Sequence, residues 1–315
     1  MKLKDIYELV ITKGMEKDPR GAGVKKILEK TKKDYAELKD KDLKFFDKDS
    51  LLSPYNDTRI LFGDDEEEIE TVLVGIDMEI GEILLADRLT EKGTKIDLII
   101  SHHPEGRALA ALHKVMSMQE DILEQYGVPI NIAEGIMSSR ISEVQRGLMP
   151  LNHNRAVDVA KLFNIPFMCM HTPADNHVQE FLNCTFAEKN PETLHDVVDI
   201  LRDIPEYEQA TFMGAGPKII LGSEKKRTGK IFVDMTGGTS GSSKGFEKLA
   251  IAGVGTIVGM HMSEAHRKEA EKYHINVIIA GHMASDSLGM NLLLDHLEGK
   301  GLKIVPCSGL IRIKR

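Results

Sequence analysis

Residues 96–104 read Ile-Asp-Leu-Ile-Ile-Ser-His-His-Pro, an apolar run that ends in two adjacent histidines and a proline. The apolar run predicts a short buried strand, and Pro104 predicts its end, because proline has no N–H to donate within a sheet. Neighbouring side chains point to opposite faces of a strand, so the imidazoles of His102 and His103 can converge only where the strand ends. There they could hold a metal ion, or they could cap a solvent-exposed strand edge.

Two further apolar runs end in the same residue types. One leads to His171 and continues to Asp175, and the other leads to His282 and continues to Asp286. A spacing of four residues places both groups on one face of a helix, about 6 Å apart along its axis. The carboxyl ends of strands are also where open α/β sheets form their ligand crevices. This repetition favours the metal-site interpretation of the strand ends.

The set of motifs, in this order, resembles the Nif-three-like family (NGG-one-interacting factor three), whose members are often labelled type-two relatives of GTP cyclohydrolase I. The family's opening motif, first strand, double histidine, His-Thr-x-x-Asp motif and Gly-His…Gly motif all have counterparts in this chain. The matching segments are residues 55–64, 71–77, 101–104, 171–175 and 281–289.

The chain also departs from the family pattern in three places. The opening motif has Tyr55 instead of tryptophan and a different residue order, and Asp286 stands where glutamate is usual. An extra segment is inserted between His103 and Asn154. Because aspartate is one methylene shorter than glutamate, a bridging contact from Asp286 would either tighten or be lost.

The resemblance implies a two-lobed α/β fold with mixed sheets flanked by helices. Helical periodicity before this region predicts, in addition, a helical N-terminal extension. The extension is expected over residues 1–48, the first lobe over 49–187 and the second over 188–315, with the metal site between the lobes. Apolar runs alternate with helical patterns along both lobes, as this architecture requires. The elements that periodicity predicts are helices at 80–92, 108–126, 155–163, 191–203 and 244–252 and a strand at 229–235.

Composition limits the functional classes. A chain of 315 residues with 42% hydrophobic residues can bury two cores. A net charge of −8 and the lack of tryptophan argue against a nucleic-acid partner, which would require a basic surface. We also expect no membrane partner and a cytoplasmic location, because no apolar run is long enough to span a bilayer and the start lacks a signal-peptide pattern. Three scattered cysteines predict neither a disulfide framework nor a thiolate zinc site.

Residues 236–245 read Thr-Gly-Gly-Thr-Ser-Gly-Ser-Ser-Lys-Gly and connect a predicted strand to a predicted helix. Such a loop offers backbone N–H groups to an anion. It does not match the Walker pattern, because Lys244 follows a serine and Gly245 occupies the Ser/Thr position. Two interpretations therefore stay open, a contact to a substrate phosphate and a tight structural turn.

Residues 261–266, His-Met-Ser-Glu-Ala-His, resemble a family segment that contains two histidines. Glu264 or His266 could transfer a proton at a metal site. Alternatively, Ser263 could simply cap a helix that starts here, with Glu264 in its first turn. The remaining histidines, His177 among them, show no ligand spacing and are expected at surface or loop positions.

These observations predict a protein that binds two divalent metal ions per chain. Imidazole and carboxylate donors without thiolate suit Zn, Mn, Fe or Co and do not discriminate among them. The predicted ligands are His102, His103, Asp175, His282 and Asp286, and the candidate catalytic groups are His171, Glu264 and His266.

We predict a metal-dependent hydrolase that acts on a small molecule, namely a nucleotide, a phosphoester or a cyclic amide-type compound. The family label suggests opening of a purine nucleotide ring, but no guanine-reading residues can be identified in the sequence. The alternative is a non-catalytic metal-binding protein with a regulatory or protein-interaction role. The resemblance further implies a homo-oligomer, a toroidal hexamer.

Overall fold

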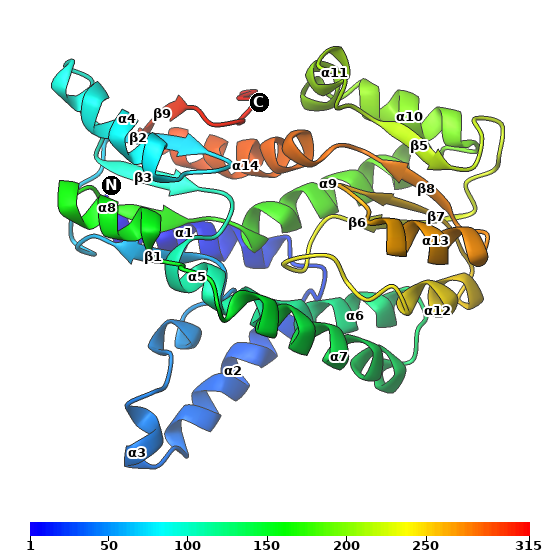
Figure 1. Ribbon diagram of the computed structural model, residues 1–315, viewed down its shortest axis with the longest axis horizontal. Coiled ribbons are helices and arrows are strands. Elements are labelled where there is room, and N and C mark those ends of the chain that lie inside the picture. The colour runs from blue at the N-terminus through cyan, green and yellow to red at the C-terminus, as the bar shows by residue number, and fades with distance from the viewer.

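The computed structural model describes residues 1–315 and contains two mixed sheets, each flanked by helices (Figure 1). The strand order is β1-β4-β3-β2-β9 in the first sheet and β5-β8-β7-β6 in the second. In each sheet one edge strand is antiparallel and the other pairs are parallel. The expected α/β fold class is confirmed. The strands are β1 (Arg59–Phe62), β2 (Thr71–Gly75), β3 (Leu98–Ser101), β4 (Phe167–Cys169), β5 (Lys218–Leu221), β6 (Lys230–Asp234), β7 (Val254–Gly259), β8 (Asn276–Ile279) and β9 (Lys303–Pro306).

Helices make most of the connections between the strands. None of them is both long enough and apolar enough to cross a membrane. They are α1 (Leu3–Glu16), α2 (Gly23–Ala36), α3 (Asp40–Leu43), α4 (Ile80–Glu91), α5 (Gly106–Ala111), α6 (Met118–Gln125), α7 (Ile130–Leu148), α8 (Arg155–Phe163), α9 (Thr172–Lys189), α10 (Leu194–Arg202), α11 (Pro205–Phe212), α12 (Gly245–Ile251), α13 (Glu264–Lys272) and α14 (His282–Glu298), with 3₁₀ turns η1 (Lys48–Leu51) and η2 (Leu112–Ser117).

The parallel strands end in register, which gathers the residues that follow them. In the first sheet Gly75 pairs with Ser101 and Ser101 pairs with Cys169, so β2, β3 and β4 end at one edge. In the second sheet Gly259 pairs with Ile279 in the same way. The central strands are nearly continuous apolar runs, as expected where helices cover both faces of a sheet.

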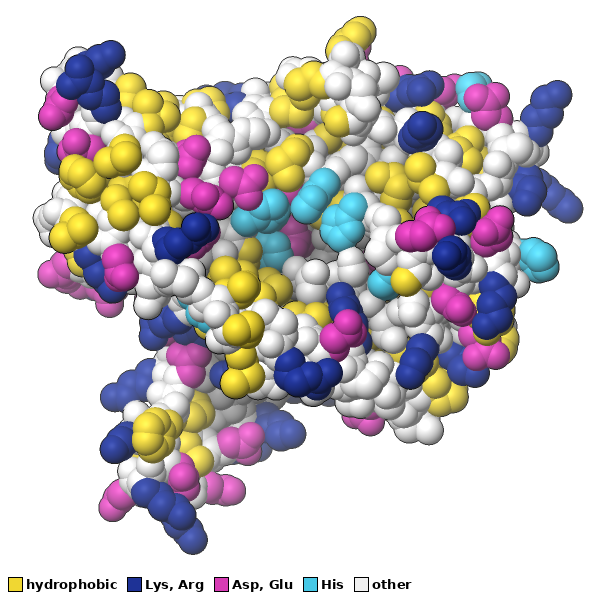
Figure 2. Space-filling view, viewed as in Figure 1, with side chains coloured by type: hydrophobic (Ala, Val, Ile, Leu, Met, Phe, Trp, Pro, Cys, Tyr) yellow, Lys and Arg dark blue, Asp and Glu magenta, His cyan; other side chains and the backbone are white.

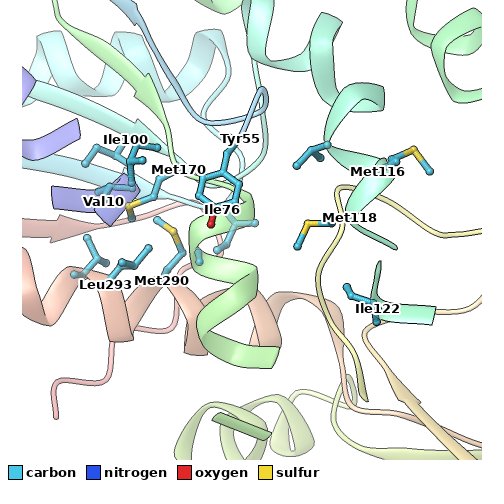
Figure 3. Packing of buried hydrophobic residues seen from close by; sticks show 14 of the residues in the cluster. Val10, Tyr55, Ile76, Ile100, Met116, Met118, Ile122, Met170, Met290 and Leu293 are labelled. Atoms are coloured by element: carbon cyan, nitrogen blue, oxygen red, sulfur yellow. The ribbon is translucent and has the colours of Figure 1, made fainter. Parts of the chain in front are cut away.

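Two long helices of the core, α9 and α14, cross between the sheets. Helix α9 starts after β4 of the first sheet, but Val178 and Leu182 pack in the core of the second lobe. Helix α14 starts after β8 of the second sheet, but its Leu293 packs beside Val10 and Met170 in the first lobe (Figure 3). The first turns of α9 and α14 therefore lie at the junction of the lobes.

This crossing corrects the domain division expected from the sequence. The second lobe was expected to include all of residues 188–315, yet β9 pairs with β2 in the first sheet. Likewise, α9 belongs by sequence to the first lobe and by packing to the second. A single boundary at residue 188 does not separate the two cores, because the chain passes between them more than once.

The N-terminal segment is helical, as expected, and has two parts. In α1, Leu3, Ile6 and Val10 are buried in the body of the protein. Helix α1 packs against α9 so closely that a Cβ on Gly14 would lie 2.6 Å from the Cβ of Pro173. Helices α2 and α3 instead project from the body as an arm (Figure 1).

The single helix expected at residues 108–126 is wrong. The segment forms α5, the 3₁₀ turn η2 and α6. The tighter turn buries Leu112, Val115 and Met116 together, a spacing that also fits the pattern of an uninterrupted helix. The inserted segment, which also contains α7, joins the largest hydrophobic cluster through Met116 and Met118 (Figure 3).

Candidate metal centre

The aligned strand ends bring four imidazoles together between the lobes. His102 and His103 follow β3, His171 precedes α9, and His282 opens α14. The ring centroids of His102 and His171 are 4.8 Å apart, and those of His103 and His282 are 5.2 Å apart. The three strand-end motifs thus converge on one cluster.

Asp286 lies among these imidazoles. Its Oδ1 is 3.5 Å from His102 Nε2, and its Oδ2 is 3.4 Å from the Nε2 atoms of both His103 and His282. The side chain is 1% exposed, and neither oxygen has a hydrogen-bond partner. The two oxygens therefore face two different sets of histidines.

Asp175 makes a second, neighbouring group. Its Oδ1 lies 3.5 Å from His102 Nε2, and its Oδ2 lies 3.8 Å from His171 Nε2. The donor atoms of His102, His171 and Asp175 lie within 4.8 Å of one another. The same holds for His102, His103 and Asp286. Either group can hold a metal ion, as the sequence predicted for this region.

The outer nitrogens of these histidines are held by other groups. Asp57 Oδ2 lies 2.8 Å from His171 Nδ1, and Asp77 Oδ1 lies 2.7 Å from His103 Nδ1. His102 Nδ1 lies 3.1 Å from a backbone carbonyl. With Nδ1 donating in each case, Nε2 is directed inward with a free lone pair. Carboxylates and carbonyls behind histidines orient metal ligands in this way in many proteins.

The charge balance of the cluster also suits a cation. Burial raises the pKa of Asp175 well above its ordinary value. Burial acts in the same direction on Asp286, but the imidazoles, His102 foremost, hold its pKa below the ordinary value. Burial lowers the pKa of His282 to about 4, so this imidazole is neutral at neutral pH.

For His103, burial opposes the charged form, but Asp286 and Asp77 outweigh it and raise the pKa to about 9. Without metal, His103 Nε2 therefore also carries a proton, directed at Asp286, and a metal ion would replace this proton. His102 Nε2, Asp175 Oδ1 and both carboxylate oxygens of Asp286 are buried without hydrogen-bond partners. Unsatisfied buried acceptors are costly, and a divalent cation would satisfy all of them together.

Two of the predicted catalytic residues lie elsewhere. Glu264 is exposed and accepts hydrogen bonds from Arg267 at 2.9 and 3.0 Å. His266 contacts Ser263 Oγ through Nδ1 and the Gly241 carbonyl through Nε2. Ser263 accepts from the His266 backbone N–H, as the helix-cap alternative predicted. The third, His171, lies in the cluster with the five predicted ligands.

The structure adds four residues that sequence reasoning missed. Asp57 and Asp77 support ligand histidines, and His261 and Asp234 line the pocket. The ring of His261 lies 4.9 Å from that of His282. Asp77, Asp234 and His261 all lie at the carboxyl ends of strands. A search for ligand-type residues directly after apolar runs, which identified His102, would therefore have identified these three as well. Asp57 precedes β1, and only the family's opening motif pointed to it.

The cluster opens into a pocket of about 290 Å³ between the lobes. Figure 2 shows histidines gathered around this hollow, with carboxylates beside and beneath them. Leu109 and Leu112 of the inserted segment form one wall, and Thr236, Gly238, Thr239 and Ser240 of the glycine-rich loop form another. A small molecule can therefore reach the cluster.

Comparison with solved structures extends these observations. A NIF3 superfamily protein from Sphaerobacter thermophilus is 26% identical in sequence, with a TM-score of 0.70 over 81% of this chain and 92% of that chain. Reduced HcgD from Methanocaldococcus jannaschii is 13% identical, with a TM-score of 0.49 over 84% of this chain and 94% of that chain. The sequence matches no protein-family model and no curated protein. The first similarity agrees with the resemblance that the motifs carry.

Proposed function

Because the chain is a NIF3-like protein, we propose that it is a metal-dependent hydrolase with two divalent ions in the pocket between its lobes. The observation that supports this proposal is that His102, Asp175 and Asp286 have buried metal-ligating atoms without hydrogen-bond partners. Six side chains converge there, more than one closed four-coordinate ion requires. The proposed ligands are His102, His171 and Asp175 for one ion and His103, His282 and Asp286 for the other.

Asp286 is proposed to link the two positions, because its oxygens face different histidines. When bound, divalent ions supply Lewis acidity to a carbonyl or phosphoryl oxygen and lower the pKa of water. Asp57 and Asp77 are proposed to orient His171 and His103. These carboxylates also keep Nε2 as the free nitrogen of each ring.

Proton transfer is proposed for the polar groups that line the pocket, since Glu264 does not reach it. Asp234 projects into the pocket and is exposed within it. Desolvation by the surrounding protein raises its pKa to about 6. A carboxylate with this pKa can accept a proton at neutral pH. His261 also lines the pocket, and burial lowers its pKa, so this imidazole is neutral at neutral pH.

Elemental analysis and a hydrolysis panel test the proposal together. Wild type reconstituted at neutral pH with Zn, Mn, Fe or Co is expected to hold two ions and to hydrolyse phosphoesters, nucleotides or cyclic amides above background. Asp286→Asn is expected to bind metal about 10-fold or more weakly, because the amide keeps the shape but lacks the charge. Asp286→Glu is expected to keep both ions and change the rate.

Asp158→Asn, on the exposed face of α8, is the matched control and should behave as wild type. One ion or none in reconstituted wild type would contradict the two-ion proposal. Two ions with background rates for every substrate class would replace the hydrolase by the non-catalytic metal-binding alternative.

A further inference from the structure

The glycine-rich loop between β6 and α12 forms part of the metal pocket. Thr236, Gly238, Thr239 and Ser240 line the same pocket as His103, together with other members of the cluster. The sequence left open whether this loop contacts a phosphate or is only a turn. Its hydrogen bonds favour the phosphate contact, because side chains occupy its carbonyls while several of its N–H groups have no acceptor in the protein.

Gln119 of α6 holds the first half of the loop. Its Nε2 donates to the carbonyls of Gly237 and Thr239, each at 2.7 Å. The fit leaves no room for larger residues, since a Cβ on Gly237 would lie 2.5 Å from Gln119 Cγ and one on Gly241 would lie 2.4 Å from Gln119 Oε1. The loop is thus shaped around a buried side chain of the inserted segment.

Side-chain N–H groups of Arg140 and His266 hold the second half of the loop. Arg140 of α7 donates through Nε to the Ser240 carbonyl at 3.0 Å. His266 Nε2 lies 3.0 Å from the Gly241 carbonyl. Four carbonyls of the loop are therefore tied to side chains of α6, α7 and α13, and none of the four is free to accept from a ligand.

The N–H groups of the same loop have a different environment. Those of Gly238, Ser240 and Gly241 donate to no protein acceptor, and neither do the hydroxyls of Thr239 and Ser240. Consecutive N–H groups around residues of positive φ form anion-binding concavities. Gly237 and Gly238 have φ values of 110° and 84°, so the loop has this character.

Charge decides when an anion could enter. Asp175, Asp234 and Asp286 all line the pocket, so without cations their carboxyl groups give an anion no net attraction. Two divalent ions would reverse the sign of the field near the loop. The buried, unpartnered oxygens of Asp175 and Asp286 are the independent sign that cations belong there.

We propose that Gly238, Thr239 and Ser240 bind the phosphate group of a phosphoester substrate, opposite the metal cluster, with Gln119 and Arg140 as positioning residues. The inference rests on the proposed function and narrows it, since it selects phosphoesters over cyclic amides. The loop supplies N–H and hydroxyl donors to the phosphate oxygens, and charge-assisted hydrogen bonds of this kind are strong.

Calorimetric titration of the full-length, metal-loaded protein with inorganic phosphate tests the inference. Wild type is expected to bind phosphate when loaded and not when metal-free. Gln119→Leu and the double variant Thr239→Ala/Ser240→Ala are each expected to weaken binding about 10-fold with unchanged metal content. Gln125→Leu is the control, because Gln125 is exposed on the same helix and its side chain hydrogen-bonds only to the Pro19 carbonyl, away from the loop.

If Gln119→Leu does not fold, the double variant decides, since Thr239 and Ser240 are half-buried and their hydroxyls make no hydrogen bond to the protein. Equal phosphate binding by wild type and the loop variants would overturn the inference, because the anion would then be held by metal alone. Lack of phosphate binding by loaded wild type would overturn it as well. A protein that takes up no metal would overturn the proposed function itself, which elemental analysis of the same samples shows separately.

Discussion

Asp286 is one methylene shorter than the glutamate usual in the family, and its oxygens still face histidines of both groups. The oxygens of Asp286 lie 3.5 Å from His102 Nε2 and 3.4 Å from the Nε2 atoms of His103 and His282. The short side chain reaches them because α14 begins directly after β8, which brings its first turn against the strand ends of the first sheet.

His177 is buried, so the prediction that it lies at the surface or in a loop is wrong. It is 4% exposed, its Nδ1 donates to the Pro173 carbonyl at 2.7 Å, and its Nε2 is buried without a partner. Spacing along the sequence could not reveal this, because the face of α9 that carries His177 is covered by other helices.

Burial lowers the pKa of His177 to about 4, from 6.5 when unfolded. The unfolded chain therefore binds the proton first as pH falls, so the stability that neutral His177 contributes is present above pH 6.5 and lost towards pH 4. Between pH 6.5 and pH 4, we expect the free energy of unfolding of metal-free wild type to fall by on the order of 3 kcal/mol more than that of His177→Gln. Chemical denaturation at a series of pH values measures the difference.

His195→Gln serves as the control for this measurement. His195 is exposed, so its replacement should leave the pH dependence of wild type unchanged. Parallel stability curves for wild type and His177→Gln would show that His177 does not titrate as a buried group.

Helices α9 and α14 are the elements that build the cluster, and their close approach depends on glycine. A Cβ on Gly289 would lie 2.3 Å from the Ala174 carbonyl oxygen, a backbone atom that can move only with its helix. Ala174 immediately precedes Asp175, and Gly289 lies three residues after Asp286. Separation of the helices would thus separate the two carboxylates of the cluster.

We therefore expect Gly289→Ala to lower both stability and metal affinity. Overpacking of this kind costs about 1–3 kcal/mol, and thermal unfolding should show it. Gly135→Ala in α7 is the matched control, because nothing lies within 4 Å of its added Cβ. That variant should be neutral or more stable by about 0.5–1 kcal/mol. Wild-type melting and metal content in Gly289→Ala would contradict the role given to this contact.

At the scale of the whole molecule, the family resemblance predicts a toroidal hexamer. Exposed apolar side chains lie on the adjoining helices α4 and α8, including Leu84 at 46% and Leu162 at 84% exposed. Figure 2 shows hydrophobic side chains gathered on the face over these helices. Exposed apolar patches often mark contacts between proteins.

Multi-angle light scattering is expected to give the mass of a hexamer for wild type. Leu162→Glu should shift the protein towards smaller species, whereas Lys161→Glu on the same helix changes charge without removing apolar surface and should not. A monomer at low and high concentration would contradict the predicted assembly. A hexamer in all three proteins would place the interface away from α8.

Local sequence was sufficient to predict many of the strands and most of the candidate metal ligands. Apolar runs that end in histidine located β3, β4 and β8, and the four-residue spacing placed Asp175 and Asp286 on the same helical faces as their histidines. These properties depend on neighbours within a turn or a strand, so periodicity and proline positions report them directly.

Other features depended on contacts between distant segments. Asp57, Asp77, Asp234 and His261 join the cluster, and Glu264 does not, because membership depends on which strand ends share an edge and on where α9 and α14 cross. The same holds for the glycine-rich loop, whose shape is set by Gln119 more than one hundred residues earlier. No periodicity carries that information, since it arises only when both sheets and the inserted helices pack together.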